Sequence, residues 1–166
     1  GNYIINCMGA IPQRTDNFDI NWYLPIWLDL NASCRVIHPG TDCEMDLDDY
    51  GISKNIAGNY IRNLSTRTKS IKTSIIGPEL SGKTSLLEWF LSQKKQVFGY
   101  TNALWNGNTT LEWCIHCELM IKKWDSFPKE TIISSDQVSK YELLKIFNAV
   151  FDKNINVFPK SLGHNK

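Results

Sequence analysis

The sequence has almost no net charge and no long apolar run. Its 166 residues hold 18 Lys and Arg against 17 Asp and Glu, a formal net charge of +1 at pH 7. A chain so close to neutral lacks the field that draws a protein to nucleic acid or to an anionic membrane. No apolar stretch approaches the roughly 20 residues that a membrane-spanning helix needs, and the first residues lack the basic region of a signal peptide. We therefore expect neither a nucleic-acid-binding nor a membrane protein.

Cysteine is scarce and irregularly spaced. The five cysteines are an odd number, whereas a secreted disulfide framework usually has an even, regular set: Cys7, Cys34, Cys43, Cys114 and Cys117. Reduced thiols in a cytoplasmic protein are the better interpretation. Cys114 and Cys117 enclose His116, a spacing that suggests zinc, but zinc needs about four ligands and no second C-x-x-C exists. We predict no metal site there, only a buried helix face.

Hydrophobic residues make up 42% of the chain, enough for an ordinary globular core. Short apolar runs alternate with segments of helical periodicity, which predicts an α/β fold with parallel strand pairing. The predicted strands cover residues 3–7, 35–38, 72–76, 131–133 and 155–158. The predicted helices cover residues 49–64, 85–94, 109–123 and 138–151, and one more that either begins near Trp22 or kinks at Pro25.

One segment matches a nucleotide-binding motif. Residues 77–84 spell G-x-x-x-x-G-K-[ST] between a predicted strand and a predicted helix, the context of a P-loop. In a P-loop, backbone N–H groups surround the phosphates, the lysine reaches the terminal oxygens and the Ser or Thr holds Mg²⁺. No apolar strand ends in an aspartate that could complete the magnesium site. A P-loop nucleotide triphosphate-binding protein is therefore the alternative, and a turn whose Lys83 lies on the surface is the preferred interpretation.

A second pattern places a phenol and an ammonium on one helix face. Tyr50 and Lys54 are four residues apart, so they lie one turn from each other. They follow a predicted strand that leads to Thr41, at the carboxyl edge where open α/β sheets bind ligands. A lysine cation near a tyrosine lowers the pKa of the phenol from about 10 toward a value useful in acid–base catalysis. Spacing alone favours an ordinary aromatic residue at the start of the helix and a solvated lysine.

Several segments, in order, resemble the extended short-chain dehydrogenase/reductase family. Residues 6–10 (NCMGA), 35–43 (RVIHPGTDC) and 50–54 (YGISK) are similar to this family, and more narrowly to the dTDP-4-dehydrorhamnose reductases and their sugar-nucleotide-binding relatives. The resemblance continues through residues 73–77, 87–91, 105–110 and 138–144. It implies a partial Rossmann-type parallel sheet with a small α/β substrate-binding lobe. Residues 1–76 would be the C-terminal half of the NAD(P)-binding domain, and residues 77–166 the sugar-nucleotide-binding lobe.

The resemblance also implies an activity, namely NAD(P)-dependent reduction or epimerisation of a nucleotide-linked sugar for cell-surface polysaccharide synthesis, by a protein that could form a homo-oligomer. Thr41 would orient the substrate carbonyl, Tyr50 would donate the proton, and Lys54 would hold the nicotinamide ribose and tune Tyr50. The implied further contacts to the NAD(P)H cofactor are Asn6, Gly9 and Ala10. The implied contacts to the sugar nucleotide are Thr73, Trp105 and Asn106.

The sequence departs from the family in two places. No glycine-rich G-x-x-G-x-x-G turn, which binds the cofactor diphosphate, occurs in the 166 residues. The segment from Thr41 to Tyr50 is short, and Glu44-Met45 replaces the family's Val-Phe-x-Gly. We therefore expect a truncated or internally deleted homologue, or a fragment, that binds NAD(P)H weakly and alone has no measurable reductase activity. A non-catalytic sugar-nucleotide-binding remnant is the other alternative.

Overall fold

A computed structural model describes residues 2–163 of the chain. The chain divides into two compact units, one made of residues 1–74 and 110–133 and the other of residues 75–109 and 134–166. The chain first passes from one unit to the other after residue 74, close to the expected boundary at residue 76. The chain then returns to the first unit over residues 110–133, which sequence reasoning had assigned to the second lobe. It returns because this segment supplies a helix and an edge strand to the first unit's sheet.

The first unit is built on a four-stranded parallel sheet. Its strands stand in the order β1-β2-β3-β8. Ile37 of β2 pairs with Ile5 of β1 on one side and with Lys69 of β3 on the other. The predicted α/β fold with a parallel, Rossmann-like sheet is confirmed. The strand bounds are β1 (Tyr3–Ile5), β2 (Arg35–Gly40), β3 (Thr68–Lys72) and β8 (Glu130–Ile132).

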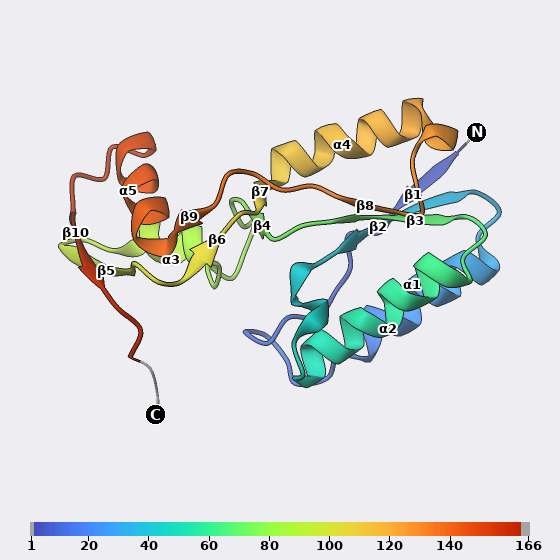
Figure 1. The fold of residues 1–166 in the computed structure, drawn as a ribbon, viewed down its shortest axis with the longest axis horizontal. Coiled ribbons are helices and arrows are strands. Elements are labelled where there is room, and N and C mark those ends of the chain that lie inside the picture. The colour runs from blue at the N-terminus through green and yellow to red at the C-terminus, as the bar shows by residue number, and fades with distance from the viewer. Residues whose placement is uncertain (1, 164–166) are drawn as a thin grey trace. The chain divides into compact units, whose positions relative to one another are not determined.

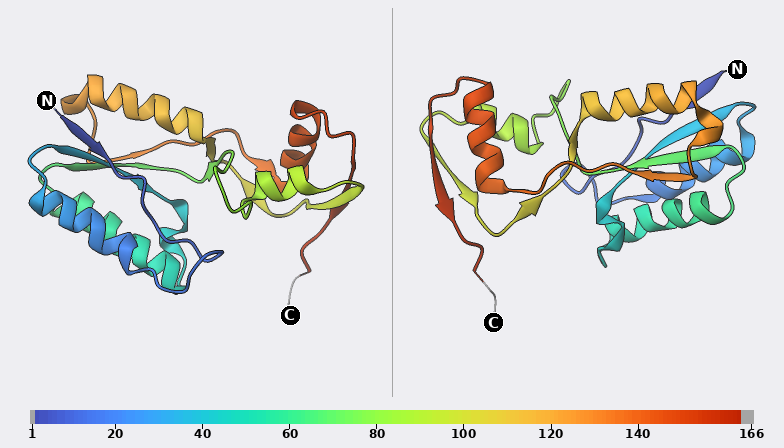
Figure 2. Two further views of the ribbon diagram at one scale, coloured as in Figure 1. Left: turned by 180° about the vertical axis from the view of Figure 1, so that it is seen from behind. Right: turned by 45° about the horizontal axis from the view of Figure 1, so that its top comes forward.

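Helices cover both faces of this sheet. Figures 1 and 2 show α1 (Asp19–Asn31) and α2 (Asp49–Asn63) on one face and α4 (Thr110–Lys122) on the other. The core under α4 joins two strand isoleucines to residues of α4 and the turn that follows it: Ile37, Ile71, Trp113, Cys117, Met120 and Trp124. None of the helices in residues 2–163 is long and apolar enough to cross a membrane.

Two prolines are accommodated where the sequence predicted breaks. Helix α1 starts at Asp19, earlier than expected, and continues through a buried Pro25 to Asn31. Strand β2 also runs beyond its expected end, through Pro39 to Gly40. Past Ile37, β2 pairs in the ladder only with β3. The N–H that proline lacks is therefore tolerated, as it is on an edge strand.

The predicted third strand, residues 72–76, was wrong in its bounds. Strand β3 ends at Lys72, and β4 (Ile75–Ile76) is a separate short strand of the second unit. Buried positions of β3 are occupied by Thr68 and Ser70, with exposed fractions of 2% and 1%. Because these buried residues are polar, a hydrophobicity pattern does not indicate a strand at their positions. The prediction therefore fell on the isoleucines that follow.

The second unit is smaller, and its described residues form three pairs of short strands. The parallel pair of β5 (Gln96–Tyr100) and β10 (Asn156–Lys160) packs against α5 (Lys140–Val150), and α3 (Leu86–Ser92) packs on α5. The remaining pairs are β4 with β7 (Asn108–Thr109) and β6 (Leu104–Trp105) with β9 (Val138–Ser139). Leu87, Phe90, Leu144 and Phe147 lie in its core. Sequence reasoning missed β5 and placed Val138 and Ser139 in a helix.

Candidate active site

The candidate site lies in the first unit, at the carboxyl edge of its parallel sheet. Strand β1 leads there into the loop of residues 6–10, and β2 leads into η1, a short 3₁₀ helix (Asp42–Met45). Helix α2 begins immediately afterwards at Asp49, with the Asp48 carboxylate capping the N–H of Gly51 at 2.7 Å. Parallel strands place their carboxyl ends at one edge, so segments far apart in sequence meet at this point.

Thr41 and Tyr50 come together across the short loop. The Thr41 hydroxyl is close enough to the Tyr50 phenol to affect its pKa, donates to the Asp42 carboxylate at 3.3 Å, and caps η1 by accepting the N–H of Cys43. Burial raises the pKa of Tyr50, and this outweighs the lowering caused by the Thr41 hydrogen bond. The ring of Phe18 packs edge-on against the Tyr50 ring, with centroids 5.7 Å apart. Tyr50 is therefore a protonated, half-buried phenol at neutral pH, as a proton donor must be.

Lys54 lies one turn further along α2 and is buried, with 8% of its surface exposed. Its Nζ is 5.8 Å from the centroid of the Tyr50 ring. Burial lowers the pKa of Lys54, while the nearby Glu44 carboxylate and Cys43 thiol raise it less. Among the residues that the structure describes, none forms a hydrogen bond with this ammonium. A buried cation with unused donors is the type of group that holds the hydroxyls of a ligand.

The loop after β1 approaches Lys54 closely. A Cβ added to Gly9 would lie 3.4 Å from Lys54 Nζ and 3.3 Å from Asn21 Oδ1, so only glycine leaves this space open. Asn21, a residue of α1 that sequence reasoning missed, accepts the N–H of Ala10 and donates to its carbonyl. It also donates to Ser53. Asn21 thus fixes the loop against α2 beside Lys54.

Asn6 connects β1 to a buried histidine below the site. Its Oδ1 accepts the N–H of Met8 at 3.0 Å, so its Nδ2 is a donor and faces Nδ1 of His38 at 3.0 Å. Nδ1 must therefore accept, which places the imidazole proton on Nε2. Burial, together with the charge of Lys54, lowers the pKa of His38 to about 3. His38 is a neutral residue of the scaffold, and its proximity to Lys54 could not be read from the sequence.

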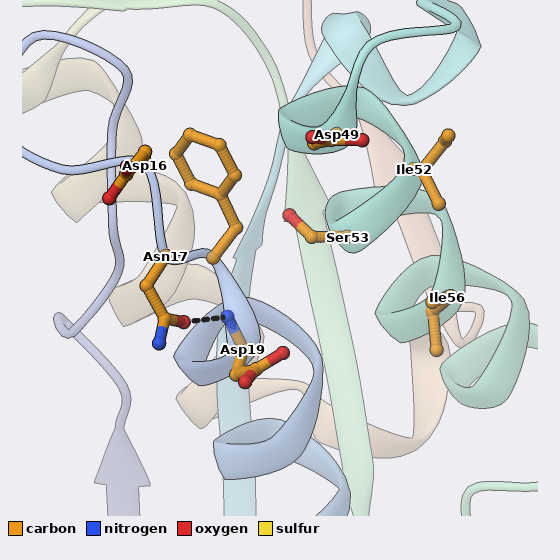
Figure 3. A pocket seen from close by; sticks show the side chains of 8 residues that line it. Asp16, Asn17, Asp19, Asp49, Ile52, Ser53 and Ile56 are labelled. Atoms are coloured by element: carbon orange, nitrogen blue, oxygen red, sulfur yellow. Dashed lines mark hydrogen bonds between the residues drawn. The ribbon is translucent and has the colours of Figure 1, made fainter.

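A polar pocket of about 500 Å³ lies beside these residues, between the first turns of α1 and α2. Figure 3 shows Asp16 and Asp19 on one side of it and Asp49 and Ser53 on the other, and Phe18 also lines it. The three carboxylates carry negative charge. This pocket is therefore unsuited to a diphosphate and more suited to hydroxyl groups.

The three residues implied for the sugar nucleotide lie in different units. Thr73 is buried directly after β3, where its N–H donates to the Gly40 carbonyl, at the same edge as Thr41. Trp105 and Asn106 belong to the second unit. There Lys140 Nζ lies 6.0 Å from the centroid of the Trp105 ring. Lys140 also lines an apolar pocket of about 330 Å³, together with the aromatic residues Trp89, Phe98 and Tyr100.

The P-loop match does not have the geometry of a phosphate site. The Glu79 carboxylate accepts the N–H of Ser85 and the hydroxyl of Thr84, the groups that a phosphate and its Mg²⁺ would use. Lys83 is exposed and adopts a left-handed backbone conformation, with φ 51°. The helix that follows has only seven residues. An internal carboxylate thus occupies the groups that a phosphate would need, and the segment forms a turn held by its own hydrogen bonds.

Replacing Lys83 by alanine is expected to change the free energy of unfolding by no more than about 0.5 kcal/mol, because the side chain is exposed. The measurement is thermal unfolding, with calorimetric titration of ATP and Mg²⁺ into both proteins. Glu79→Gln is the matched variant in the same turn and should lower the melting temperature, since it weakens the hydrogen bonds that the Glu79 carboxylate accepts from Thr84 and Ser85. Magnesium-dependent ATP binding that disappears in Lys83→Ala would contradict this and restore the P-loop hypothesis.

The cysteine pair of α4 divides between core and surface. Cys117 is buried among the core residues of the first unit, and burial raises the pKa of its thiol to about 12. Cys114 is exposed. The expectation of a buried helix face therefore holds for Cys117 alone. Within residues 2–163 no group of three or more His, Cys, Asp and Glu side chains is placed to hold a metal ion.

Searches against protein-family models and curated proteins find no match to the chain. Solved structures do match. The dTDP-4-dehydrorhamnose reductase of Bacillus anthracis, solved with NADP, has a TM-score of 0.75 at 13% identity, over 96% of this chain and 66% of that one. The dTDP-4-dehydrorhamnose reductase of Clostridium acetobutylicum has a TM-score of 0.75 at 13% identity, over 99% of this chain and 67% of that one.

A related enzyme shows a similar match. The dTDP-glucose 4,6-dehydratase of B. anthracis, solved with NAD, has a TM-score of 0.67 at 14% identity, over 98% of this chain and 61% of that one. The chain thus spans about two thirds or less of the length of these enzymes. The resemblance read from the sequence is confirmed at the level of the fold, which this chain shares with nucleotide-sugar reductases and dehydratases.

Proposed function

We propose that this chain carries the proton-donating and nicotinamide-ribose-binding part of an NAD(P)-dependent oxidoreductase that acts on a nucleotide-linked sugar. The observation that carries the proposal is the meeting of the Tyr50 phenol, the Thr41 hydroxyl and the buried Lys54 ammonium at the carboxyl edge of a parallel sheet. The fold shared with reductases and dehydratases of nucleotide-linked sugars supports it. Reduced thiols fit a cytoplasmic enzyme, and polysaccharide synthesis is the process that this substrate class suggests.

The residues of the site fit a nicotinamide cofactor. Lys54 offers a buried ammonium without a hydrogen-bond partner among the described residues, and Gly9 leaves a space beside it that a Cβ would fill. Lys54 would hold the ribose hydroxyls, with the backbone of residues 6–10 on the other side. When bound, NAD(P)H supplies the hydride for reduction of a carbonyl. The diphosphate would need donors other than those of the acidic pocket near Asp49.

In this proposal, residues of the chain orient the substrate and supply the proton. Thr41 would donate a hydrogen bond to the substrate carbonyl oxygen and so orient it toward Tyr50. Tyr50, protonated at neutral pH because burial raises its pKa, would donate its proton to the developing alkoxide. The Lys54 cation would stabilise the phenolate left behind. Thr73 would contact the sugar from the same edge, and Trp105 and Asn106 are proposed contacts in the second unit.

Cofactor binding at this site can be tested directly. Titration of NADPH into protein labelled with ¹³C at the tyrosine Cζ atoms is expected to shift the Tyr50 resonance, assigned with Tyr50→Phe. Lys54→Met should weaken binding at least about tenfold, because it removes one charge-assisted hydrogen bond to the ligand. Lys69→Met, on β3 of the same unit, is the matched control and should leave the affinity unchanged. NADPH binding that leaves Tyr50 unshifted, or that survives in Lys54→Met, would overturn the proposal.

A further inference from the structure

A buried ion-pair network lies directly beneath η1, the 3₁₀ helix that follows Thr41. Its centre is the Glu44 carboxylate, which is 3% exposed. Lys72 at the end of β3 donates to Glu44 Oε2 at 2.8 Å, and Arg62 of α2 donates to the same oxygen at 3.1 Å. Arg62 also pairs with Glu130 of β8 at 2.7 Å. One side chain of η1 is thus held by two cations from two different elements.

The backbone of η1 is fixed onto α2 as well. The Asn55 amide donates to the carbonyl of Glu44 at 2.9 Å. Two glycines of α2 make the contact possible, since a Cβ on Gly58 would lie 2.6 Å from Glu44 Oε2 and one on Gly51 would lie 2.7 Å from the carbonyl of Cys43. Gly51 and Gly58 are seven residues apart, so they lie on one face of α2. This face receives η1 along its length.

The network lies where a positioning function is needed. Thr41 immediately precedes η1, and Tyr50 and Lys54 are on the helix against which η1 packs. The loop that joins Thr41 to Tyr50 is short and mostly exposed, with Met45 at 80% and Leu47 at 94% exposure. Apolar packing therefore does little to fix the position of the Thr41 hydroxyl. The Glu44 side chain is the buried anchor of this loop.

We infer that Glu44 is a positioning residue, whose ion pairs with Lys72 and Arg62 hold η1 against α2 so that the Thr41 hydroxyl meets the Tyr50 phenol. The inference rests on the proposed function for its catalytic meaning, but the geometry it predicts can be measured without cofactor or substrate. Removing the carboxylate frees η1, and the Thr41 hydroxyl then moves away from the Tyr50 phenol.

The experiment reads the Tyr50 ¹³Cζ resonance at neutral pH, which responds to hydrogen bonding at the phenol oxygen. Thr41→Val sets the shift caused by losing the hydroxyl, and Thr41→Ser should restore the parent position. Glu44→Ala is expected to shift the resonance in the same direction as Thr41→Val. The double variant should shift no further than Thr41→Val alone, because both substitutions remove one contact. Glu118→Ala, which removes an exposed ion pair with Lys122 on α4 of the same unit, should leave Tyr50 in place.

If Glu44 only stabilises the fold, Glu44→Ala lowers the melting temperature while the Tyr50 resonance stays in place. That result would overturn the inference. If circular dichroism shows that Glu44→Ala is unfolded, Glu44→Gln is measured in its place, because it keeps the side-chain volume. A shifted Tyr50 resonance then supports the inference, and an unshifted one overturns it. Failure of NADPH to bind the parent protein would overturn the proposed function and leave this result standing, so the two failures are distinguishable.

Discussion

Replacement of Asp29 by alanine is expected to lower the free energy of unfolding by about 4 kcal/mol, because it leaves several buried donors without an acceptor. Asp29 lies on α1 with 2% of its surface exposed. Its carboxylate accepts hydrogen bonds from Tyr60 and from side chains and backbone N–H groups of the turn between α2 and β3: Ser65, Thr66, Arg67 and Thr68. Burial raises the pKa of Asp29, but the hydrogen bonds outweigh it and bring the pKa down to about 2.

Urea unfolding at neutral pH measures this change. Asp125→Ala is the matched control, because Asp125 is an exposed aspartate paired with Arg35 at the surface, and its loss should cost less than about 1 kcal/mol. Asp29→Asn keeps the volume and one acceptor oxygen, and should fall between the two. Equal stability of Asp29→Ala and Asp125→Ala would show that the turn after α2 finds other acceptors, contrary to the expectation.

The sequence predicted the fold well where apolar patterning is clear. The strand predicted at residues 35–38 and the helix predicted at residues 49–64 correspond to β2 (Arg35–Gly40), where Val36 and Ile37 are buried, and to α2 (Asp49–Asn63). Strand β3 was misplaced because its buried Thr68 and Ser70 are polar. The return of residues 110–133 to the first unit is a property of topology, and no local pattern in the segment indicates which sheet it joins.

The candidate site was predictable in part for a similar reason. Tyr50 and Lys54 are tied by helix spacing, and the family resemblance identified Thr41. Asn21, His38 and Glu44 were missed, since each acts through a partner 18 or more residues away, as in the pair of Arg62 and Glu44. Asparagine on a helix and glutamate in a loop are ordinary surface residues by pattern. Only the tertiary structure shows that they are buried at 1% and 3% exposure.

His38 should make the protein sensitive to mild acid. The pKa of His38 is lowered from 6.5 to about 3, mainly by burial and further by the charge of Lys54. Between these two values the unfolded chain binds a proton that the folded chain does not, so stability falls as the pH falls. The loss amounts to about 1.4 kcal/mol per pH unit, or about 3 kcal/mol between pH 6.5 and about pH 4. Protonation would also place a donor at Nδ1 against the amide donor of Asn6.

The test is urea unfolding of the parent and of His38→Gln at a series of pH values. Glutamine cannot take up the proton, so the difference in unfolding free energy between the two proteins should be constant above pH 6.5 and should shift in favour of the variant by about 3 kcal/mol by about pH 4. Titration of Asp29 does not affect this comparison. Its contribution to the unfolding free energy is fully present above the ordinary pKa of 3.8 and is lost only below it, toward its pKa of about 2 in the folded chain. Parallel stability curves for the two proteins across this range would contradict the expectation. They would mean that the imidazole beneath Lys54 takes up its proton as readily in the folded chain as in the unfolded one.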